Sequence, residues 1–217
     1  MTGPRRSPAA GWDGIRADEA DLDVLSQVIA DAFFDLAPSQ WLITDPGIRG
    51  RIFPRYFRLY LEHALTHGTV HTTPSRTAAA LWVPGGQDAT GPPDGYAERL
   101  AALTSPWTSR FLAFDEALDR HHPTGIPHQH LAILAVHPDH QGRGIGTALL
   151  QAWHATLDDA GTPAYLEASS PRTRGLYLAH GYFPRPDAPF YLPDGGPPMW
   201  PMWRDPRART AHSGNTG

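Results

Sequence analysis

The run Gln141–Thr147 holds glycines at alternate positions, in the order Gln-Gly-Arg-Gly-Ile-Gly-Thr. It follows an apolar segment that ends at Val136 and leads into apolar residues at helical spacing, which predicts a strand, a tight turn and a helix start. Glycine lets the backbone approach a ligand closely, and the free N–H groups and dipole of a helix start favour a pyrophosphate. A dinucleotide-binding turn has the spacing Gly-x-Gly-x-x-Gly, which this run does not match. A plain connection is the alternative, but so many glycines at a helix start are costly without a ligand.

Composition restricts the rest of the chemistry. All 18 residues counted as Lys or Arg are Arg, and the chain has no Cys. It therefore has no lysine for a P-loop or a Schiff base, and no thiolate for a disulfide, an iron–sulfur cluster or nucleophilic catalysis. The histidine pair His128 and His130, like the pair His137 and His140, lacks the pattern of a closed zinc site, so we expect no metal.

Length and charge suit a single enzyme-sized domain. The chain has 217 residues and a formal net charge of −4, which argues against nucleic acid as the main partner. No apolar run reaches the roughly 18 to 20 residues that a membrane span needs, and the first residues lack the apolar stretch of a signal peptide. We expect a cytoplasmic protein with one domain over residues 15–204. Residues 1–14 and 205–217 are expected to be flexible tails.

The elements that must position these residues are predicted from periodicity. Apolar residues at spacings of three and four predict helices over 17–34, 48–67 and 94–120, the last interrupted near Pro106. A loop is expected over 35–45. Strands are expected over 69–73, 77–83, 130–137, 164–168, 190–192 and 199–203, and a short helix over 174–180. Glu167 lies inside one of these apolar strands, where a carboxylate is costly unless it is paired or functional.

Gln-Gly-Arg-Gly-Ile-Gly resembles the Gln/Arg-x-x-Gly-x-Gly/Ala signature of the GNAT acetyltransferase superfamily. Further segments follow in the family's order: Leu131–Val136, Thr147–Leu150, Tyr165–Ser169 and Leu176–Tyr182. Ala80–Pro84 and Met199–Trp203 look like the branch of the superfamily that includes puromycin N-acetyltransferase. The resemblance covers about Ile15 to Arg204. It implies a single-domain α/β fold with a mostly antiparallel central sheet of six or seven strands and helices on both faces.

The resemblance also implies a site for acetyl-CoA. The expected cofactor-binding residues are Leu134, Ala135, Val136, Gln141, Gly142, Arg143, Gly144, Ile145, Gly146, Thr147, Ser170 and Thr173. Tyr177 matches the helix tyrosine that protonates the departing CoA thiolate, and a phenol is neutral at pH 7. Glu167 is the candidate base, acting directly or through water with the help of a raised pKa. The alternatives are a core position for Tyr177 and a structural hydrogen bond for Glu167.

The implied reaction is direct acetyl transfer to a primary amine of a small molecule, such as an antibiotic or a metabolite. Side chains expected to line the acceptor site are Phe34, Asp35, Trp41, Trp82 and Tyr191. A protein or peptide N-terminus as acceptor, and a non-catalytic acyl-CoA-binding module, are the alternatives. No membrane or nucleic-acid partner is expected, and the sequence leaves open whether the chain forms a homodimer.

Overall fold

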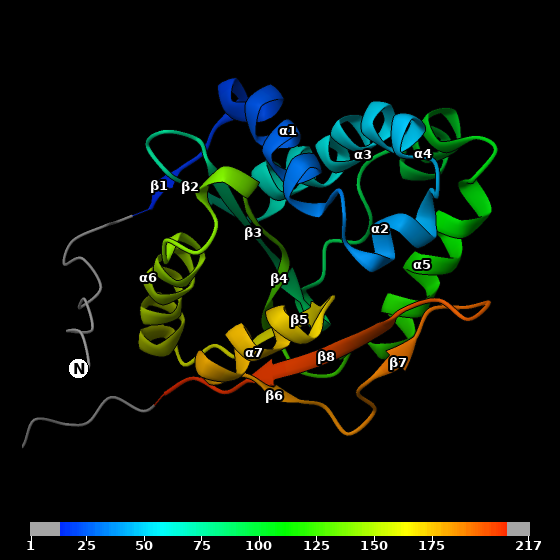
Figure 1. Cartoon of the computed structure of the whole chain (residues 1–217). Helices are drawn as coiled ribbons and strands as arrows, with labels where there is room; N and C mark the ends of the chain where they lie inside the picture. The colour runs from blue at the N-terminus through cyan, green and yellow to red at the C-terminus, as the bar shows by residue number, and fades with distance from the viewer. Residues whose placement is uncertain (1–13, 208–217) are drawn as a thin grey trace, which may run out of the picture.

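The computed structural model describes residues 14–207 as a layered α/β fold, shown in Figure 1. Its strands are β1 (Ile15–Arg16), β2 (Thr69–Thr72), β3 (Ala78–Gly85), β4 (His128–Val136), β5 (Ala164–Ala168), β6 (Phe183–Pro184), β7 (Phe190–Tyr191) and β8 (Pro198–Arg204). Its α-helices are α1 (Leu22–Phe33), α2 (Ala37–Leu42), α3 (Pro46–His67), α4 (Tyr96–Thr104), α5 (Thr108–His121), α6 (Ile145–Ala160) and α7 (Pro171–Ala179). Short 3₁₀ turns lie at Glu19–Asp21, Gly86–Asp88 and Pro138–His140.

The strands form one sheet in the order β1-β2-β3-β4-β5-β8-β6, and β7 pairs with β8 outside this path. Neighbouring strands are antiparallel except β4 with β5, which are parallel. That parallel pair is short, because only Gln129 and His130 find partners, in Ala164 and Tyr165. Beyond His130 the two strands part, and the sheet is split at its centre.

Helices cover both faces of the sheet (Figure 1). Ile133 and Ala135 of β4 belong to the core beneath α1 and α3, whereas Leu131 belongs to the core beneath α6. The exchange of faces follows from an extra residue in β4: Leu81 pairs with Ile133 and Trp82 with Leu131, so Ala132 has no partner in β3. A bulge of this kind redirects the side chains that follow it, and here it lies where β4 leaves β5.

The expected mixed α/β fold, mostly antiparallel and covered by helices, is confirmed. Over residues 14–207 the sheet has eight strands rather than six or seven, because two-residue strands such as β1 and β6 are too short to leave a pattern in the sequence. The expected loop over 35–45 contains the six-residue helix α2. The interruption near Pro106 separates α4 from α5, as expected. Helix α3 continues through Pro54 and begins at Pro46, where the carboxylate of Asp45 accepts a hydrogen bond from the N–H of Ile48.

The ends of the chain are described in part. Residues 1–13 and 208–217, which hold most of both expected tails, lie outside the described residues. The last described residue, Arg207, lies beside α6, where its backbone N–H donates to Asp158 at 2.8 Å. Within 14–207, no helix is long and apolar enough to cross a membrane.

Candidate active site

The glycine turn lies at the start of α6. Gly142 and Gly144 have φ angles of +75° and +81°, a left-handed conformation that glycine adopts without a Cβ penalty. A Cβ added at either position meets no atom within 4 Å, so the space in front of the turn is open. The hydrogen bonds of α6 begin at Ala148, whose N–H donates to the carbonyl of Gly144. The N–H groups before it in α6 are free to bind an anion.

The side chains of the turn hold its own backbone in place. The amide of Gln141 donates to the carbonyl of Val136 at 3.1 Å, and the guanidinium of Arg143 donates to the carbonyl of Asp139 at 2.7 Å. Both contacts fasten the turn to the end of β4. Arg143 is exposed and does not belong to the lining of the cavity described below, so what the turn offers to a ligand is backbone.

The split between β4 and β5 exposes one edge of β4. Apart from Ala132, residues 131–136 pair with β3 on one side, and within residues 14–207 they have no strand partner on the other. Leu134 and Val136 turn their side chains toward α6 and line the cavity, whereas Ala135 is packed in the core beneath α1. Of these, Ala135 can reach a ligand only through its backbone.

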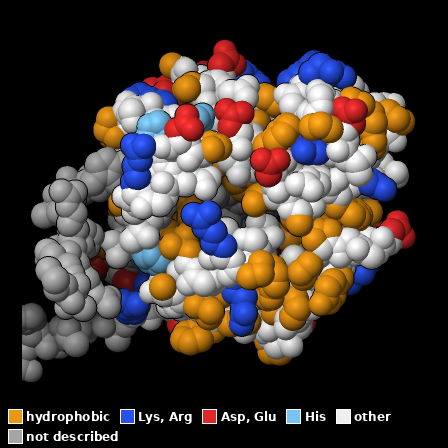
Figure 2. Space-filling view, in the orientation of Figure 1, with side chains coloured by type: hydrophobic (Ala, Val, Ile, Leu, Met, Phe, Trp, Pro, Cys, Tyr) orange, Lys and Arg blue, Asp and Glu red, His pale blue; other side chains and the backbone are white. Residues whose placement is uncertain are grey.

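A cavity of about 490 Å³ fills the split and extends toward α1, α3 and α5. Figure 2 shows the molecule hollowed near the middle of one face. The cavity brings together most of the expected cofactor-binding positions, namely Leu134, Val136, Gln141, Gly142, Gly144, Ile145, Gly146, Thr147, Ser170 and Thr173, with Glu167 and Tyr177. Its wall on the helical side is formed by Ala32, Phe33, Leu36, Pro38, Ser39, Leu42, Tyr56, Phe57, Tyr60, Phe114 and Leu118.

Glu167 is paired with histidines. Its Oε2 lies 3.0 Å from Nε2 of His130, and its Oε1 lies 3.9 Å from Nδ1 of His122. Burial alone raises the pKa of Glu167, but His130 and His122 outweigh it and hold that pKa well below the ordinary value. The expected raised pKa is therefore wrong, because the sequence did not show that two imidazoles surround the carboxylate. Glu167 stays ionised, and His130, which also lines the cavity, is the adjacent group that can take up a proton.

Tyr177 lies on α7 and faces the cavity while being 93% buried, with 7% of its surface exposed. Burial raises the pKa of its phenol well above the ordinary value, so the hydroxyl is protonated at neutral pH. Its ring packs edge-on against Tyr182, with centroids 5.7 Å apart. The phenol is thus a rigidly held proton donor at the cavity wall.

Ser170 and Thr173 hold the start of α7. The hydroxyl of Ser170 accepts from the N–H of Thr173, and the hydroxyl of Thr173 accepts from the N–H of Ser170, both at 3.1 Å. This is a reciprocal cap of a helix start. Both residues also line the cavity, together with Arg172, which adds a cationic side chain to that wall.

The side chains expected to line the acceptor site lie outside the cavity lining. Phe34 stacks beneath the guanidinium of Arg49, and Asp35 is exposed. Trp82 is fully buried and packs against Trp153 and His154 of α6, in the core on the opposite face from α1 and α3.

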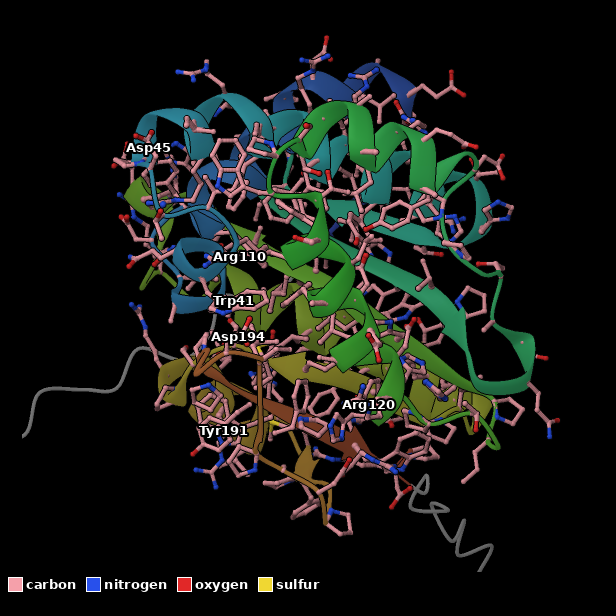
Figure 3. All side chains as sticks on the ribbon, turned by 90° about the vertical axis from the view of Figure 1, so that its right-hand side faces the viewer. Trp41, Asp45, Arg110, Arg120, Tyr191 and Asp194 are labelled. Atoms are coloured by element: carbon pink, nitrogen blue, oxygen red, sulfur yellow. The ribbon has the colours of Figure 1, made fainter. Side chains whose placement is uncertain are left out.

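Trp41 is half-buried against the core, and Tyr191 lies at the surface. Figure 3 shows Trp41 beside Arg110, whose guanidinium donates to the carbonyl of Trp41 at 2.6 Å. Tyr191 is 67% exposed. Residues close to the expected ones line the cavity instead. Phe33 and Leu36, near Phe34 in sequence, and Met199, which pairs with β7, belong to its wall.

Several wall residues were not expected from the sequence. Tyr56, Phe57 and Tyr60 of α3 form an aromatic cluster at spacings of one, three and four, which predicts one face of the helix but not that this face lines a cavity. Phe114 and Leu118 of α5 repeat the four-residue spacing. His122 could not be placed, because a loop residue far from β5 in sequence carries no pattern that predicts contact with Glu167.

Comparisons with known proteins find similarity to acetyltransferases. Residues 111–184 match the family model described as acetyltransferase (GNAT) domain. A Corynebacterium glutamicum structure titled histone acetyltransferase HPA2 and related acetyltransferase is 25% identical, with a TM-score of 0.65 over 91% of this chain and 98% of that chain. Arylalkylamine N-acetyltransferase 2 from Aedes aegypti shares the fold at 13% identity, with a TM-score of 0.61 over 89% and 98%. An agmatine N-acetyltransferase shares it at 14% identity, with a TM-score of 0.58 over 87% and 96%.

The matched segment spans α5 to β6 and includes the glycine turn, Glu167 and Tyr177. Residues 111–184 are therefore similar to a GNAT acetyltransferase domain, and the fold of the chain is that of acetyltransferase structures.

Proposed function

We propose that the protein transfers an acetyl group from acetyl-CoA directly to the primary amine of a small molecule. One observation carries the proposal: a single cavity joins the glycine turn, the phenol of Tyr177, the His130–Glu167 pair and a largely apolar helical wall. The glycine turn suits binding of the acetyl donor, and Tyr177 and the His130–Glu167 pair suit the proton transfers. The apolar wall suits the body of an acceptor.

GNAT acetyltransferases use acetyl-CoA, and the chain's residues fit it. The open space in front of Gly142 and Gly144 admits a pyrophosphate, and the unpaired edge of β4 offers backbone groups to the amide-containing arm. Arg172 in the lining can contact a phosphate. When bound, acetyl-CoA supplies an activated acetyl thioester.

The chain's own residues can move both protons that the reaction requires. His130 donates from Nε2 to Glu167, which leaves Nδ1 to take a proton from the attacking amine, directly or through water. Glu167 is then a positioning residue that holds the imidazole and balances its positive charge. As the new N–C bond forms and the C–S bond breaks, the hydroxyl of Tyr177 gives its proton to the sulfur. Backbone N–H groups of residues 134–136 polarise the thioester carbonyl.

The acceptor is a small molecule in this proposal because the helical wall is aromatic and aliphatic. Among the described residues that line the cavity, Glu167 is the one carboxylate, and it is already paired with His130. Two structural neighbours are named for small amines, which supports the proposal by analogy of fold alone. Ala80–Pro84 and Met199–Trp203 support a place in the branch that includes puromycin N-acetyltransferase.

The test is CoA-thiol release from acetyl-CoA with a panel of primary amines, with peptides that carry free N-termini in parallel. Hexylamine, phenethylamine and tyramine represent the small amines, and mass spectrometry identifies the products. The proposal expects N-acetylated small amines and faster release with them than with peptides. Faster acetylation of peptides would favour the N-terminal alternative, and CoA binding without turnover of any amine would show a non-catalytic module.

A further inference from the structure

A chain of tyrosine hydroxyls ends in a carboxylate behind the helical wall of the cavity. The hydroxyls of Tyr56 and Tyr60 lie 3.1 Å apart, and those of Tyr60 and Tyr96 lie 2.8 Å apart. The hydroxyl of Tyr96 donates to Oδ2 of Asp115 at 2.7 Å. These residues come from α3, α4 and α5, which lie side by side in Figure 1. Tyr56 and Tyr60 line the cavity, whereas Tyr96 and Asp115 stand behind them.

The carboxylate fixes the direction of every hydrogen bond in this chain. Burial raises the pKa of Asp115 to about 6, so the group is ionised at pH 8 and can only accept. Tyr96 must therefore donate to Oδ2 of Asp115, and the single proton of Tyr60 is directed to the oxygen of Tyr96 at 2.8 Å or to Oδ1 of Asp115 at 3.4 Å. The oxygen of Tyr60 in turn accepts from Tyr56.

A phenol has one hydroxyl proton, and each tyrosine of the chain already donates that proton to the next group toward Asp115. Burial raises the pKa of Tyr56 and of Tyr60 well above the ordinary value, so neither loses that proton at pH 8. At the cavity wall, Tyr56 and Tyr60 can therefore offer only oxygen lone pairs. The negative charge of Asp115 behind them reinforces this acceptor character.

We propose that Tyr56 and Tyr60 form a distal subsite that binds a hydrogen-bond donor, an alcohol, phenol or ammonium group, on the amine acceptor. The inference rests on the proposed function, because it assigns this wall to the acceptor. The rest of that wall is apolar and includes Phe57, Phe114 and Leu118, so the preferred substrate is an amine with an apolar body and a second, donor-bearing group.

Matched ligands that differ in this group test the subsite. Tyramine carries a phenol donor, phenethylamine lacks it, and 4-methoxyphenethylamine keeps the oxygen without the proton. The pair 6-aminohexan-1-ol and heptylamine makes the same comparison, a hydroxyl against a methyl group, at the end of a flexible chain. Binding is measured by calorimetry at pH 8 on the full chain saturated with CoA, and kcat/KM is measured with acetyl-CoA. One uncharged hydrogen bond corresponds to a preference of about 3- to 10-fold for the donor-bearing partner in at least one pair.

Variants separate the subsite from general effects. Replacing both tyrosines, Tyr56→Phe with Tyr60→Phe, should abolish the preference. Tyr60→Phe frees the proton of Tyr56, so it should improve binding of 4-methoxyphenethylamine relative to tyramine. Tyr182→Phe is the matched control, because its hydroxyl is buried against His154 in the opposite core and the preference should persist. Thermal melts establish that each variant is folded.

The outcomes separate the two proposals. No binding preference in either pair, or a preference that survives the replacement of both Tyr56 and Tyr60 by Phe, would overturn the subsite even if amines are acetylated. A preference in the calorimetry without any acetylation would support the subsite and overturn the proposed reaction.

Discussion

The imidazole of His130 and the carboxylate of Glu167 meet at 3.0 Å where β4 and β5 separate. His130 is the last residue of β4 that pairs with β5, and Glu167 lies beyond the pairing on β5. The same split that opens the cavity therefore places an ionised carboxylate against an imidazole at the cavity wall. In the proposed reaction this pair receives the proton of the amine.

Changing either member of the pair should slow catalysis in a distinguishable way. His130→Gln removes the proton acceptor and should lower kcat by about 10²-fold. Glu167→Gln keeps the shape of the side chain but not its charge, so we expect a smaller loss of kcat. Steady-state rates at saturating acetyl-CoA and amine measure both losses. An unchanged kcat in His130→Gln would exclude the imidazole as the acceptor.

Replacing Tyr177 by Phe should affect the chemical step and leave donor binding intact. The variant keeps the ring packing but has no proton for the sulfur, so kcat should fall by about 10²-fold and the Kd for CoA should stay constant. Tyr182→Phe removes a hydroxyl from the ring that packs against Tyr177 and serves as control. Equal rates for Tyr177→Phe and the native chain would contradict the assignment of the phenol as acid.

The glycine turn can be tested with glycines at the two ends of α6. Gly144 precedes the helix and Gly161 follows it, both have positive φ, and a Cβ at either meets no atom within 4 Å. Alanine at either position should cost about 1 to 2 kcal/mol of stability. Only Gly144→Ala should weaken CoA binding, because its Cβ enters the space proposed for the pyrophosphate. Equal CoA affinities, by calorimetry, would place the phosphates elsewhere.

Asp115 should make the protein less stable at high pH. Its pKa is raised by burial to about 6, above the ordinary 3.8, although the hydrogen bonds from Tyr96 and Tyr60 oppose the shift. The folded state thus holds this proton more tightly than the unfolded chain, and the cost of ionisation grows as pH rises from about 4 to about 6. Asp115→Asn should raise the free energy of unfolding by about 1 to 3 kcal/mol at pH 8. Urea denaturation should show that gain vanishing near pH 4, and a loss of stability at pH 8 would refute the assignment.

Local pattern predicted the core of the fold and of the site. The apolar run before Pro138, the glycines after it and the periodic helix beyond are local features, so β4, the turn and α6 were placed correctly. Strand β5 and the segment around Tyr177 followed in the same way. Short elements with little periodicity, such as α2 and β6, gave no such signal.

Contacts across the fold could not be predicted. The pKa of Glu167 depends on His130, which lies on the neighbouring strand β4, and on His122, which lies at the end of helix α5. Trp82 was expected at the acceptor site, but alternation along β3 turns it toward α6. Which face a strand residue occupies depends on register, and in β4 register changes at the extra residue Ala132.

The most direct test of the account is the initial rate of CoA-thiol release when acetyl-CoA and a primary amine are varied together. Direct transfer in a ternary complex predicts N-acetylated product and intersecting double-reciprocal lines. Parallel lines, which indicate an acetylated enzyme, or the absence of release with any primary amine despite bound CoA, would contradict it.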